Sequence, residues 1–317
     1  MKVIEHLRKA DRTLLSFEIL PPLKGKDIHS IYRGIDPLME FKPSFINVTY
    51  HREEVIYKER GQGLLQKVRV RKRPGTVGIC AMIKAKYNID SVPHLICGGF
   101  TKEDTEDALI ELNFLGIDNV LALRGDAIKS EPAFIPERDG HVHAQDLIRQ
   151  ITALNKGMYL HDEEQEAAPT DLCVGAACYP EKHAEALNLD TDIAYLKQKV
   201  DAGAEYLVTQ MFFDNARYYR FVDLCRAEGI TVPIIPGLKP LTTLKHIAFI
   251  PKTFGIDLPQ PLASELVKCR TDADVKHLGI EWSISQTKDL MEHKAPCVHF
   301  YTMGKSEAVR SIVSQTF

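Results

Sequence analysis

Short apolar runs alternate with segments of helical period along most of this chain. Each run is bounded by Gly, Pro or charged residues, and a short bounded run of this kind favours a buried strand. The runs are continuously apolar rather than alternating, which is typical of parallel strands covered on both faces. The pattern predicts strands at 14–20, 44–50, 77–83, 119–123, 172–179, 206–213, 232–237 and 298–301.

Three segments between these runs show the beginning and end of complete helices. Thr101 precedes an acidic turn, and Gly116 follows the apolar stripe at the position of a C-terminal cap. The segments 190–204 and 215–229 repeat this plan, and Asn215 is the expected N-cap of the second.

The alternation of strand and helix predicts an α/β fold. Eight such units in about 300 residues favour a (β/α)8 TIM barrel, and an open doubly wound sheet is the alternative. No G-x-G-x-x-G or G-x-x-x-x-G-K motif follows a predicted strand, so a dinucleotide would not be held in the Rossmann way.

We expect residues 1–317 to form a single barrel domain. Helices near 259–268 and 272–292 would be additions before the last strand. The segment 159–170 is acidic and ends beside a proline, which predicts an exposed insertion before the fifth strand.

Composition narrows the class of protein. The 317 residues carry a formal net charge of -3, with 44% hydrophobic and 26% charged residues, as in a soluble globular protein. This charge gives no electrostatic case for binding nucleic acid or an anionic membrane surface. No apolar run reaches the ~18 residues of a membrane helix, and the N-terminus has no hydrophobic signal region. Seven scattered cysteines without a C-x-x-C pair favour reduced thiols in a cytoplasmic protein over a metal site.

One acid interrupts the first apolar run. Glu18 lies between Leu14 and Leu20, and the run then stops at Pro21 and Pro22. An ionised carboxylate is costly to bury alone, so we expect Glu18 at the open end of a strand, facing a cavity, with a raised pKa. An acid paired with Arg or Lys at a strand end would fit this stretch equally well.

In a barrel, the active site forms at the carboxyl ends of the strands. Polar, aromatic or glycine residues stand at or near those ends: Glu18, Thr49, Tyr50, His94, Arg124, Gly125, Asp126, Tyr179, Glu181, His183, Gln210, Asp214, Gly237, Lys239 and Tyr301. We place His94 in the loop after the third predicted strand. No nucleophile elbow and no H-E-x-x-H motif accompanies them. One acid among amide, hydroxyl and aromatic groups suits a planar heterocyclic cofactor that performs the chemistry.

Nine short motifs occur in one order between about residues 14 and 304. They are Ser16–Glu18 with Pro21–Pro22, Asn47–Tyr50, His94–Cys97, Leu123–Asp126, Tyr179–His183, Lys199–Ala204, Thr209–Phe213, Ile235–Gly237 and His299–Thr302. Together they resemble the methylenetetrahydrofolate reductase family.

The resemblance implies a (β/α)8 barrel that carries non-covalent FAD. Members take hydride from NADH or NADPH and reduce methylenetetrahydrofolate to methyltetrahydrofolate, which supplies methyl groups for methionine synthesis. The two substrates take turns at one flavin face, in ping-pong order. The resemblance therefore implies a cytoplasmic enzyme, and we expect a homo-oligomer. Animal relatives respond to S-adenosylmethionine through a C-terminal regulatory domain, which we expect this chain to lack.

The resemblance also gives roles to individual residues. Glu18 matches the general acid that protonates the leaving nitrogen when the five-membered ring of the folate opens. Asp126 matches a catalytic acid beside the pyrimidine edge of the flavin. Substrate contacts are implied for Glu18, Gln210 and Tyr301. Cofactor contacts are implied for Thr49, Tyr50, His94, Leu123, Arg124, Gly125, Asp126, His143, Ala144, Asp146, Tyr179, His183, Asp192 and Lys199.

The chain departs from the family pattern at three positions. His143 stands where relatives have a tyrosine. His246 and Ile250 stand where some bacterial relatives carry a Gln and a Phe that stack on nicotinamide and pterin, so the pattern does not choose between NADH and NADPH.

Three other functions fit parts of the pattern. A flavin barrel that oxidises an amino acid, like proline dehydrogenase, would need paired arginines near the last strand, and 301–304 offers none. An aldolase-type barrel would need a Schiff-base lysine; Lys239 is the tempting one, but its Pro-Gly-Leu-Lys-Pro context indicates a loop. A folate- or nucleotide-binding protein without turnover would hold a flavin that NADH cannot reduce.

Overall fold

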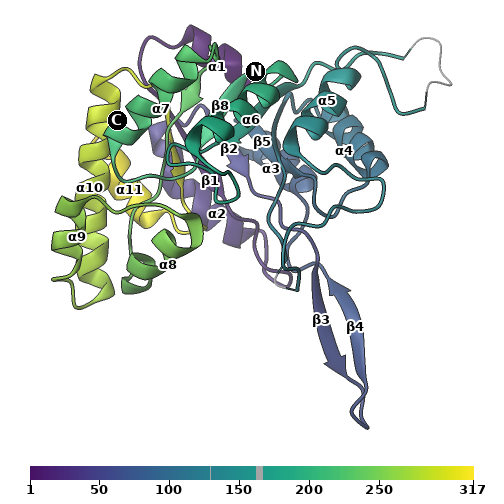
Figure 1. Cartoon of the computed structure of the whole chain (residues 1–317), viewed down its shortest axis with the longest axis horizontal. Helices are drawn as coiled ribbons and strands as arrows, with labels where there is room; N and C mark the ends of the chain where they lie inside the picture. The colour runs from purple at the N-terminus through teal and green to yellow at the C-terminus, as the bar shows by residue number, and fades with distance from the viewer. Residues whose placement is uncertain (129, 162–166) are drawn as a thin grey trace.

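The computed structural model describes residues 1–128, 130–161 and 167–317. Within these residues, one sheet has the spatial order β10-β11-β1-β2-β5-β6-β7-β8-β9, and all its strand pairs are parallel (Figure 1). Its strands are β1 (Leu14–Ile19), β2 (Phe45–Val48), β5 (Asp90–Ile96), β6 (Asn119–Leu123), β7 (Cys173–Cys178), β8 (Tyr206–Thr209), β9 (Ile234–Ile235), β10 (Gly237–Leu238) and β11 (Cys297–Tyr301).

The sheet closes through one short run of the chain. β9 and β10 are separated only by Pro236, yet β9 pairs with β8 and β10 pairs with β11. The two ends of the sheet order therefore belong to the same run, which gives a barrel of eight strand positions. This confirms the predicted (β/α)8 barrel.

Helices surround the barrel (Figure 1). They are α1 (Val3–Lys9), α2 (His29–Ile35), the 3-10 helix η1 (Asp36–Phe41), α3 (Thr76–Tyr87), α4 (Lys102–Phe114), α5 (Ala144–Leu154), α6 (Leu189–Asp201), α7 (Asn215–Ala227), α8 (Leu244–Phe254), α9 (Gln260–Leu266), α10 (Asp272–Glu292) and α11 (Glu307–Val313). None of the helices in the described residues is long and apolar enough to cross a membrane.

The predicted helices are found with small changes at their ends. Thr101 caps α4 by accepting a hydrogen bond from Asp104, as expected. The predicted cap Asn215 is wrong by one residue, because Asp214 accepts the capping bond from Ala216 at 3.0 Å. The additional helices before the last strand are α9 and α10.

The predicted third strand is wrong. Residues 77–83 lie inside helix α3, and the strand at this point of the barrel is β5. The buried positions Thr76, Ile79, Cys80 and Ile83 have the helical spacing i, i+3, i+4, i+7. A short apolar run does not separate helix from strand, and Pro93 with its polar neighbour His94 hid the real strand. His94 therefore lies on β5 and not in a loop.

The two sides of β1 show how the barrel separates its core from its interior. Leu15, Phe17 and Ile19 belong to the main apolar core together with helix residues. Side chains alternate along a strand, so Ser16 and Glu18 face the interior of the barrel. The interior is consequently more polar than the apolar pattern of the strands predicts.

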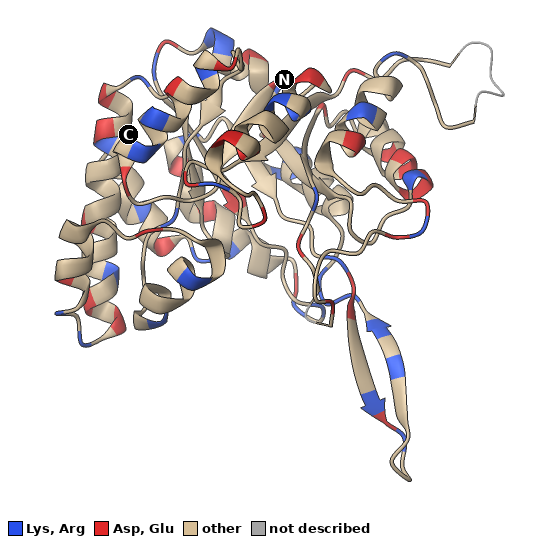
Figure 2. Ribbon diagram, viewed as in Figure 1, with Lys and Arg blue, Asp and Glu red and all other residues tan. Residues whose placement is uncertain are grey.

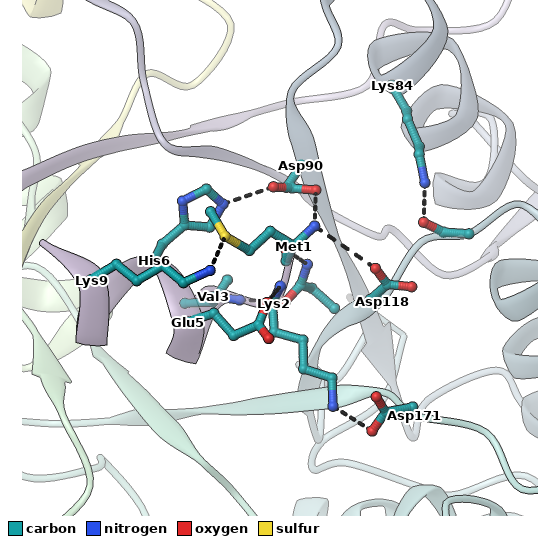
Figure 3. A network of polar contacts seen from close by, with 12 residues as sticks. Met1, Lys2, Val3, Glu5, His6, Lys9, Lys84, Asp90, Asp118 and Asp171 are labelled. Atoms are coloured by element: carbon teal, nitrogen blue, oxygen red, sulfur yellow. Dashed lines mark hydrogen bonds and ion pairs between the residues drawn. The ribbon is translucent and has the colours of Figure 1, made fainter.

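Helix α1 lies against the amino-terminal ends of the strands (Figure 3). Val3 and Ile4 pack in a cluster with strand residues such as Phe45 and Leu121. The Val3 N–H donates to Asn119 Oδ1 at 2.7 Å, and Asp90 binds both the Met1 ammonium and His6, each at 2.7 Å. This end of the barrel is therefore filled by packing and ion pairs, and the opposite end is the one available for a ligand.

A β-hairpin that the sequence analysis did not predict follows β2. It consists of β3 (Glu54–Glu59) and β4 (Leu65–Val70), which pair antiparallel and project away from the barrel (Figure 1). Lysine and arginine positions lie along the ribbon (Figure 2), and Tyr57, Leu64 and Leu65 are exposed. The hairpin follows directly on β2, and its base contributes to the rim of the active-site end.

The insertion predicted at 159–170 is described only at its ends. His161 is exposed, whereas Tyr159 donates to the Ala168 carbonyl oxygen at 2.9 Å and Thr170 is buried. Residues 162–166 lie outside the described residues. The predicted exposed insertion can therefore be compared with the structure only at its two ends.

Two glycines offer a matched test of packing outside the barrel. On α10, a Cβ added at Gly279 would collide with the Leu241 carbonyl oxygen, whereas a Cβ at Gly78 on α3 would meet no atom within 4 Å. We expect Gly279→Ala to lower the free energy of unfolding by about 2–3 kcal/mol, because the backbones must separate. Gly78→Ala should raise it by about 0.5–1 kcal/mol, because alanine favours helix. Urea unfolding measures both, and equal effects would contradict this packing.

Candidate active site

A cavity of about 880 Å³ opens at the carboxyl ends of the strands. Its volume lies within the ~300–1,000 Å³ of typical ligand sites. Of the catalytic, substrate and cofactor residues implied by the resemblance, all except Asp146 line the cavity, whereas the strand-end residues Glu181, Asp214 and Gly237 do not. The predicted residues that line the cavity are Glu18, Thr49, Tyr50, His94, Leu123, Arg124, Gly125, Asp126, His143, Ala144, Tyr179, His183, Asp192, Lys199, Gln210 and Tyr301.

Three acids near the strand ends have other structural partners. Asp146 accepts from the His143 N–H at 3.3 Å and pairs with Arg149 at 2.7 Å, so it caps α5 and is not among the residues that line the cavity. Glu181 pairs with Arg217 at 3.1 Å, and Asp214 caps α7. The prediction that Asp146 contacts a ligand in this cavity therefore lacks support from the geometry.

Glu18 is the buried acid of the cavity. Its side chain comes from β1 and is 8% exposed. Burial raises the pKa of Glu18 to about 8, and the positive charge of Lys239 opposes this rise. The carboxyl group therefore holds its proton near neutral pH, as a general acid requires. This agrees with the expected raised pKa and cavity position.

Neutral histidines surround this acid. His94 Nε2 lies 3.6 Å from Glu18 Oε2, and His299 Nδ1 lies 2.9 Å from Ser16 Oγ. Burial lowers the pKa of both His94 and His299 to about 3, so neither carries a charge near neutral pH. His94 therefore supports Glu18 as a neutral polar neighbour and does not form an ion pair with it.

The interior also contains polar atoms without a partner. His299 Nε2 and Asn47 Oδ1 are buried and make no hydrogen bond to the residues that the structure describes. Both residues line the cavity. Buried polar atoms are normally paired, so these two atoms indicate that a polar ligand approaches the floor of the barrel.

The loop after β6 is held at the rim by an ion pair. Both terminal nitrogens of Arg124 bind Glu185 at 2.6 Å, and the guanidinium lies 5.1 Å from the Phe134 ring centroid. Gly125 has φ +82°, and a Cβ there would lie 3.2 Å from Ile96 Cδ1, so this turn requires glycine. The exposed carboxylate of Asp126 follows directly and enters the cavity lining.

Another part of the cavity is built around helix α6. Asp192 accepts from the His183 N–H at 2.7 Å, and Lys199 donates to the Ala177 carbonyl oxygen at 3.0 Å. Tyr179 packs edge-on against His183, with ring centroids 4.7 Å apart. Asp192 and Lys199 thus lie on one face of α6, as predicted; Asp192 holds the loop after β7, and Lys199 binds the end of strand β7 itself.

Helix α8 provides an aromatic side chain that the sequence analysis missed. His246, Phe249 and Ile250 all line the cavity, but Ile250 is buried in a local apolar cluster and Phe249 is exposed. Phe249, an aromatic residue of this helix, therefore stands one residue before the position aligned with the family pattern, and Phe254 at the end of the helix also lines the cavity. The hydrophobic stripe of 244–254 could have indicated it, since Ile247 and Ile250 share the buried face.

Lys239 belongs to the predicted strand-end residues, and its sequence context argues against it only as a Schiff-base lysine; the structure places it in the cavity, as its strand-end position predicts. It directly follows β10, it is half-buried, and burial lowers its pKa to about 8. His51, from the base of the hairpin, also lines the cavity and was not predicted. His51 has no sequence signal of its own, because its position depends on where the loop after β2 turns.

Comparisons with known proteins identify the family of this chain. The chain matches the family model of methylenetetrahydrofolate reductase over residues 2–316. It is 30% identical to methylenetetrahydrofolate reductase 1 of Schizosaccharomyces pombe over 99% of this chain and 48% of the relative. It is also 30% identical to 5,10-methylenetetrahydrofolate reductase of Escherichia coli K12, over 92% of this chain and 87% of the relative. The chain thus spans about half the length of the fungal relative.

A solved structure supports the fold. It is described as an uncharacterized protein from Clostridium thermocellum that binds two copies of 5-methyl-5,6,7,8-tetrahydrofolic acid. The two chains superpose with a TM-score of 0.59 and 15% identity, covering 98% of this chain and 97% of that one. The family match over nearly the whole length, together with the barrel and its cavity, shows that this chain belongs to the methylenetetrahydrofolate reductase family.

Proposed function

We propose that this chain is the catalytic barrel of an FAD-dependent methylenetetrahydrofolate reductase, with NADH or NADPH as the hydride donor. The observation that carries the proposal is Glu18, an acid that keeps its proton near neutral pH inside the strand-end cavity. Reduction of this folate needs one proton at the leaving nitrogen, and a buried carboxyl that is still protonated near neutral pH can supply it. The family membership supplies the identity of the substrate.

The residues of the cavity fit a flavin nucleotide. The volume is sufficient, the unpartnered atoms of Asn47 and His299 can bond a polar ring system, and Gly125 allows the loop after β6 to turn at the rim. When bound, FAD would supply hydride transfer between the two substrates. The residues proposed to hold it are Thr49, Tyr50, His94, Leu123, Arg124, Gly125, Asp126, His143, Ala144, Tyr179, His183, Asp192 and Lys199.

Glu18 has a defined task in this proposal. The five-membered ring of methylenetetrahydrofolate opens when its C–N bond breaks, and the departing nitrogen then needs a proton. Glu18 gives that proton and becomes a carboxylate, while the substrate becomes an iminium ion that can accept hydride. The burial that raises the pKa of Glu18 also excludes competing water from the proton transfer.

Binding of the folate is proposed for residues on the same side of the cavity. The Gln210 side chain already accepts from the Met211 N–H at 2.9 Å, which leaves its amide N–H groups for a pterin. Tyr301 donates to the Thr209 carbonyl oxygen at 2.5 Å, so it forms a fixed wall beside Glu18. Phe249 on α8 can pack against either nicotinamide or pterin, because aromatic side chains commonly stack on planar rings.

One cavity serves both substrates in this proposal, which implies that they bind in turn.

The arginines of the cavity bear on the alternative of a flavin barrel that oxidises an amino acid. Among the described residues that line the cavity, the arginines are Arg52 and Arg124, and each is paired with a glutamate, so no arginine pair is available to clamp an amino-acid carboxylate. We further propose that the enzyme assembles as a homo-oligomer in the cytoplasm.

Asp126 gives a prediction for the electrostatics of the cofactor. Its exposed carboxylate lies in the cavity lining after β6 and makes no ion pair within 4.0 Å to the described residues. A negative charge there opposes the charge that reduction adds, so Asp126→Asn should raise the midpoint potential. We expect about 30 mV or more, which for a two-electron couple corresponds to about 1.4 kcal/mol. Spectroelectrochemical titration measures it.

The control for this titration is Asp107→Asn, which removes an exposed acid from α4, outside the cavity. Its potential should equal that of the wild type. If Asp126→Asn also leaves the potential unchanged, Asp126 does not lie beside the redox-active ring.

The proposed activity is tested by product analysis. The purified protein, supplied with FAD, is incubated with methylenetetrahydrofolate and either NADH or NADPH, and methyltetrahydrofolate is measured by mass spectrometry. Product should accumulate with NADH, with NADPH or with both, and it should be absent when no nicotinamide is added. If no methyltetrahydrofolate forms with NADH or with NADPH, the proposed reductase activity is rejected.

A further inference from the structure

Lys239 occupies a position that the proposed roles do not explain. It lines the cavity, is half-buried and makes no hydrogen bond or ion pair within 4.0 Å to the described part of the chain. A buried ammonium without a partner is costly, and it is usually kept for a charge that forms during function. The identity of that charge can be read from the register of the neighbouring strands.

Glu18, Tyr301 and Lys239 lie on one row of the barrel. Glu18 on β1 is in register with Tyr301 on β11, and Phe300 on β11 is in register with Leu238 on β10. Lys239 follows Leu238, so it lies level with Tyr301 and therefore with Glu18. Neighbouring strands are ~4.8 Å apart, which places the backbones of Lys239 and Glu18 about 10 Å apart, within reach of their two side chains.

The electrostatic coupling agrees with this placement. The charge of Lys239 is the one group that counteracts the effect of burial on the Glu18 pKa, and Glu18 in turn raises the Lys239 pKa. Tyr301, which stands between them in the row, donates its hydroxyl to Thr209 and so is not free to serve Glu18.

We propose that Lys239 is a positioning residue for Glu18: its ammonium stabilises the carboxylate that Glu18 becomes when it gives its proton to the folate nitrogen. This inference rests on the proposed function. The proton moves from the Glu18 carboxyl group to the substrate nitrogen as the C–N bond breaks, and near neutral pH Lys239 keeps its own proton during this transfer. Lys239 thus makes a neutral acid easier to ionise at the moment of transfer without ionising it beforehand.

The other groups around Glu18 cannot stabilise its carboxylate with a positive charge. His94 on β5 lies 3.6 Å from the carboxyl, but its lowered pKa keeps it neutral, and so does that of His299 on β11. Asn47 on β2 is uncharged, and Tyr301 keeps its proton because burial raises its pKa. Lys305 is exposed and acts on Lys239, whose pKa it lowers.

The kinetic test compares Lys239→Met with the wild type across pH, following the folate half-reaction by anaerobic stopped flow. Without the ammonium, Glu18 becomes a weaker acid, so we expect its pKa to rise by about one unit. Near neutral pH, where Glu18 is protonated in both proteins, the rate of folate reduction should fall on the order of threefold. This value assumes that half of the change in the Glu18 pKa appears in the logarithm of the rate. The alkaline limb should move up by about one unit, so the difference shrinks at high pH. Lys239→Arg should restore the wild-type profile.

Lys245→Met is the matched control, because Lys245 is exposed on α8 and does not line the cavity. Its pH profile should equal that of the wild type. If the pH profile of Lys239→Met also equals that of the wild type, the inference is overturned. A uniform loss in Lys239→Met with an unmoved alkaline limb would also overturn it, because that result indicates lost binding only.

An optical titration separates this inference from the proposed function. Infrared difference spectroscopy of the protein without substrates should show a protonated carboxyl band that titrates near pH 8 and disappears in Glu18→Gln. In Lys239→Met, and in Lys239→Gln as a second variant, the band should titrate at higher pH. If the band moves but no folate is reduced, the coupling stands and the reductase assignment fails. If folate is reduced but the band does not move, Lys239 has no effect on Glu18.

Discussion

Replacing Glu18 by glutamine is expected to lower the rate of methylenetetrahydrofolate reduction by ~10²–10⁴-fold. Glutamine keeps the size of the side chain and can occupy the same place on β1. It has no proton that it can give to the leaving nitrogen, so the folate ring would open unassisted. Rapid-mixing measurement of the folate half-reaction under anaerobic conditions gives this rate directly.

The same variant should leave the other half of the cycle almost unchanged. Hydride transfer from a nicotinamide requires no proton from the protein at this position, so oxidation of NADH or NADPH should stay within about threefold of the wild type. A variant that reduces the folate at the wild-type rate would show that Glu18 is not the acid. A variant in which both half-reactions collapse would show instead that Glu18 supports the cavity.

Glu106 offers a matched control for this experiment. It is a buried acid with 8% exposure, as Glu18 is, but it lies on α4 and accepts a hydrogen bond from the Leu160 N–H at 2.9 Å, outside the cavity. Glu106→Gln can alter stability, yet it should not separate the two half-reactions. The selective loss of folate reduction is thus expected only at Glu18.

Acid is expected to destabilise the protein through His94 and His299, the two histidines buried in the barrel interior. His94 and His299 have a pKa of about 3 in the folded protein, against about 6.5 in the unfolded chain. Between these values the unfolded chain binds more protons, so the stability due to the neutral histidines is present above pH 6.5 and is lost as the pH falls. Between pH 7.5 and pH 5 each histidine should cost about 2 kcal/mol of the free energy of unfolding.

Urea unfolding of His299→Gln at the two pH values tests this expectation. The variant loses the contact with Ser16, so its absolute stability can fall, but its loss between pH 7.5 and pH 5 should be about 2 kcal/mol smaller than that of the wild type. His277→Gln, at an exposed position on α10, should keep the wild-type difference. An unchanged pH difference in His299→Gln would mean that His299 is not buried in its neutral form.

The barrel could be predicted because its strands are apolar, short and separated by capped helices. The run 77–83 was misassigned because Val77, Ile79 and Ile83 satisfy a strand and a helix at once, and only the packing of α3 separates them. The real strand β5 carries Pro93 and His94, which reduce its apolar signal. The third barrel strand must pair with both β2 and β6, and β5 does so, whereas residues 77–83 form a helix.

The site residues could be predicted where they stand directly on strand ends, as Glu18 and Tyr301 do. Prediction failed where a loop decides the direction of a side chain. Asp146 belongs to a motif but turns to cap its own helix, whereas His51, at the base of the hairpin, enters the cavity although no motif marks it. The hairpin of β3 and β4 was also missed, because its strands face solvent and lack a continuous apolar run.

The most direct test of the central claim is an anaerobic visible spectrum of the purified protein, recorded alone, then with NADH or NADPH, and then with methylenetetrahydrofolate. The proposed reductase should carry a bound flavin whose absorbance bleaches with one of the two donors and returns when the folate is added. A protein that carries no flavin and does not bind added FAD would contradict the proposed function. So would a bleached flavin that the folate leaves unchanged.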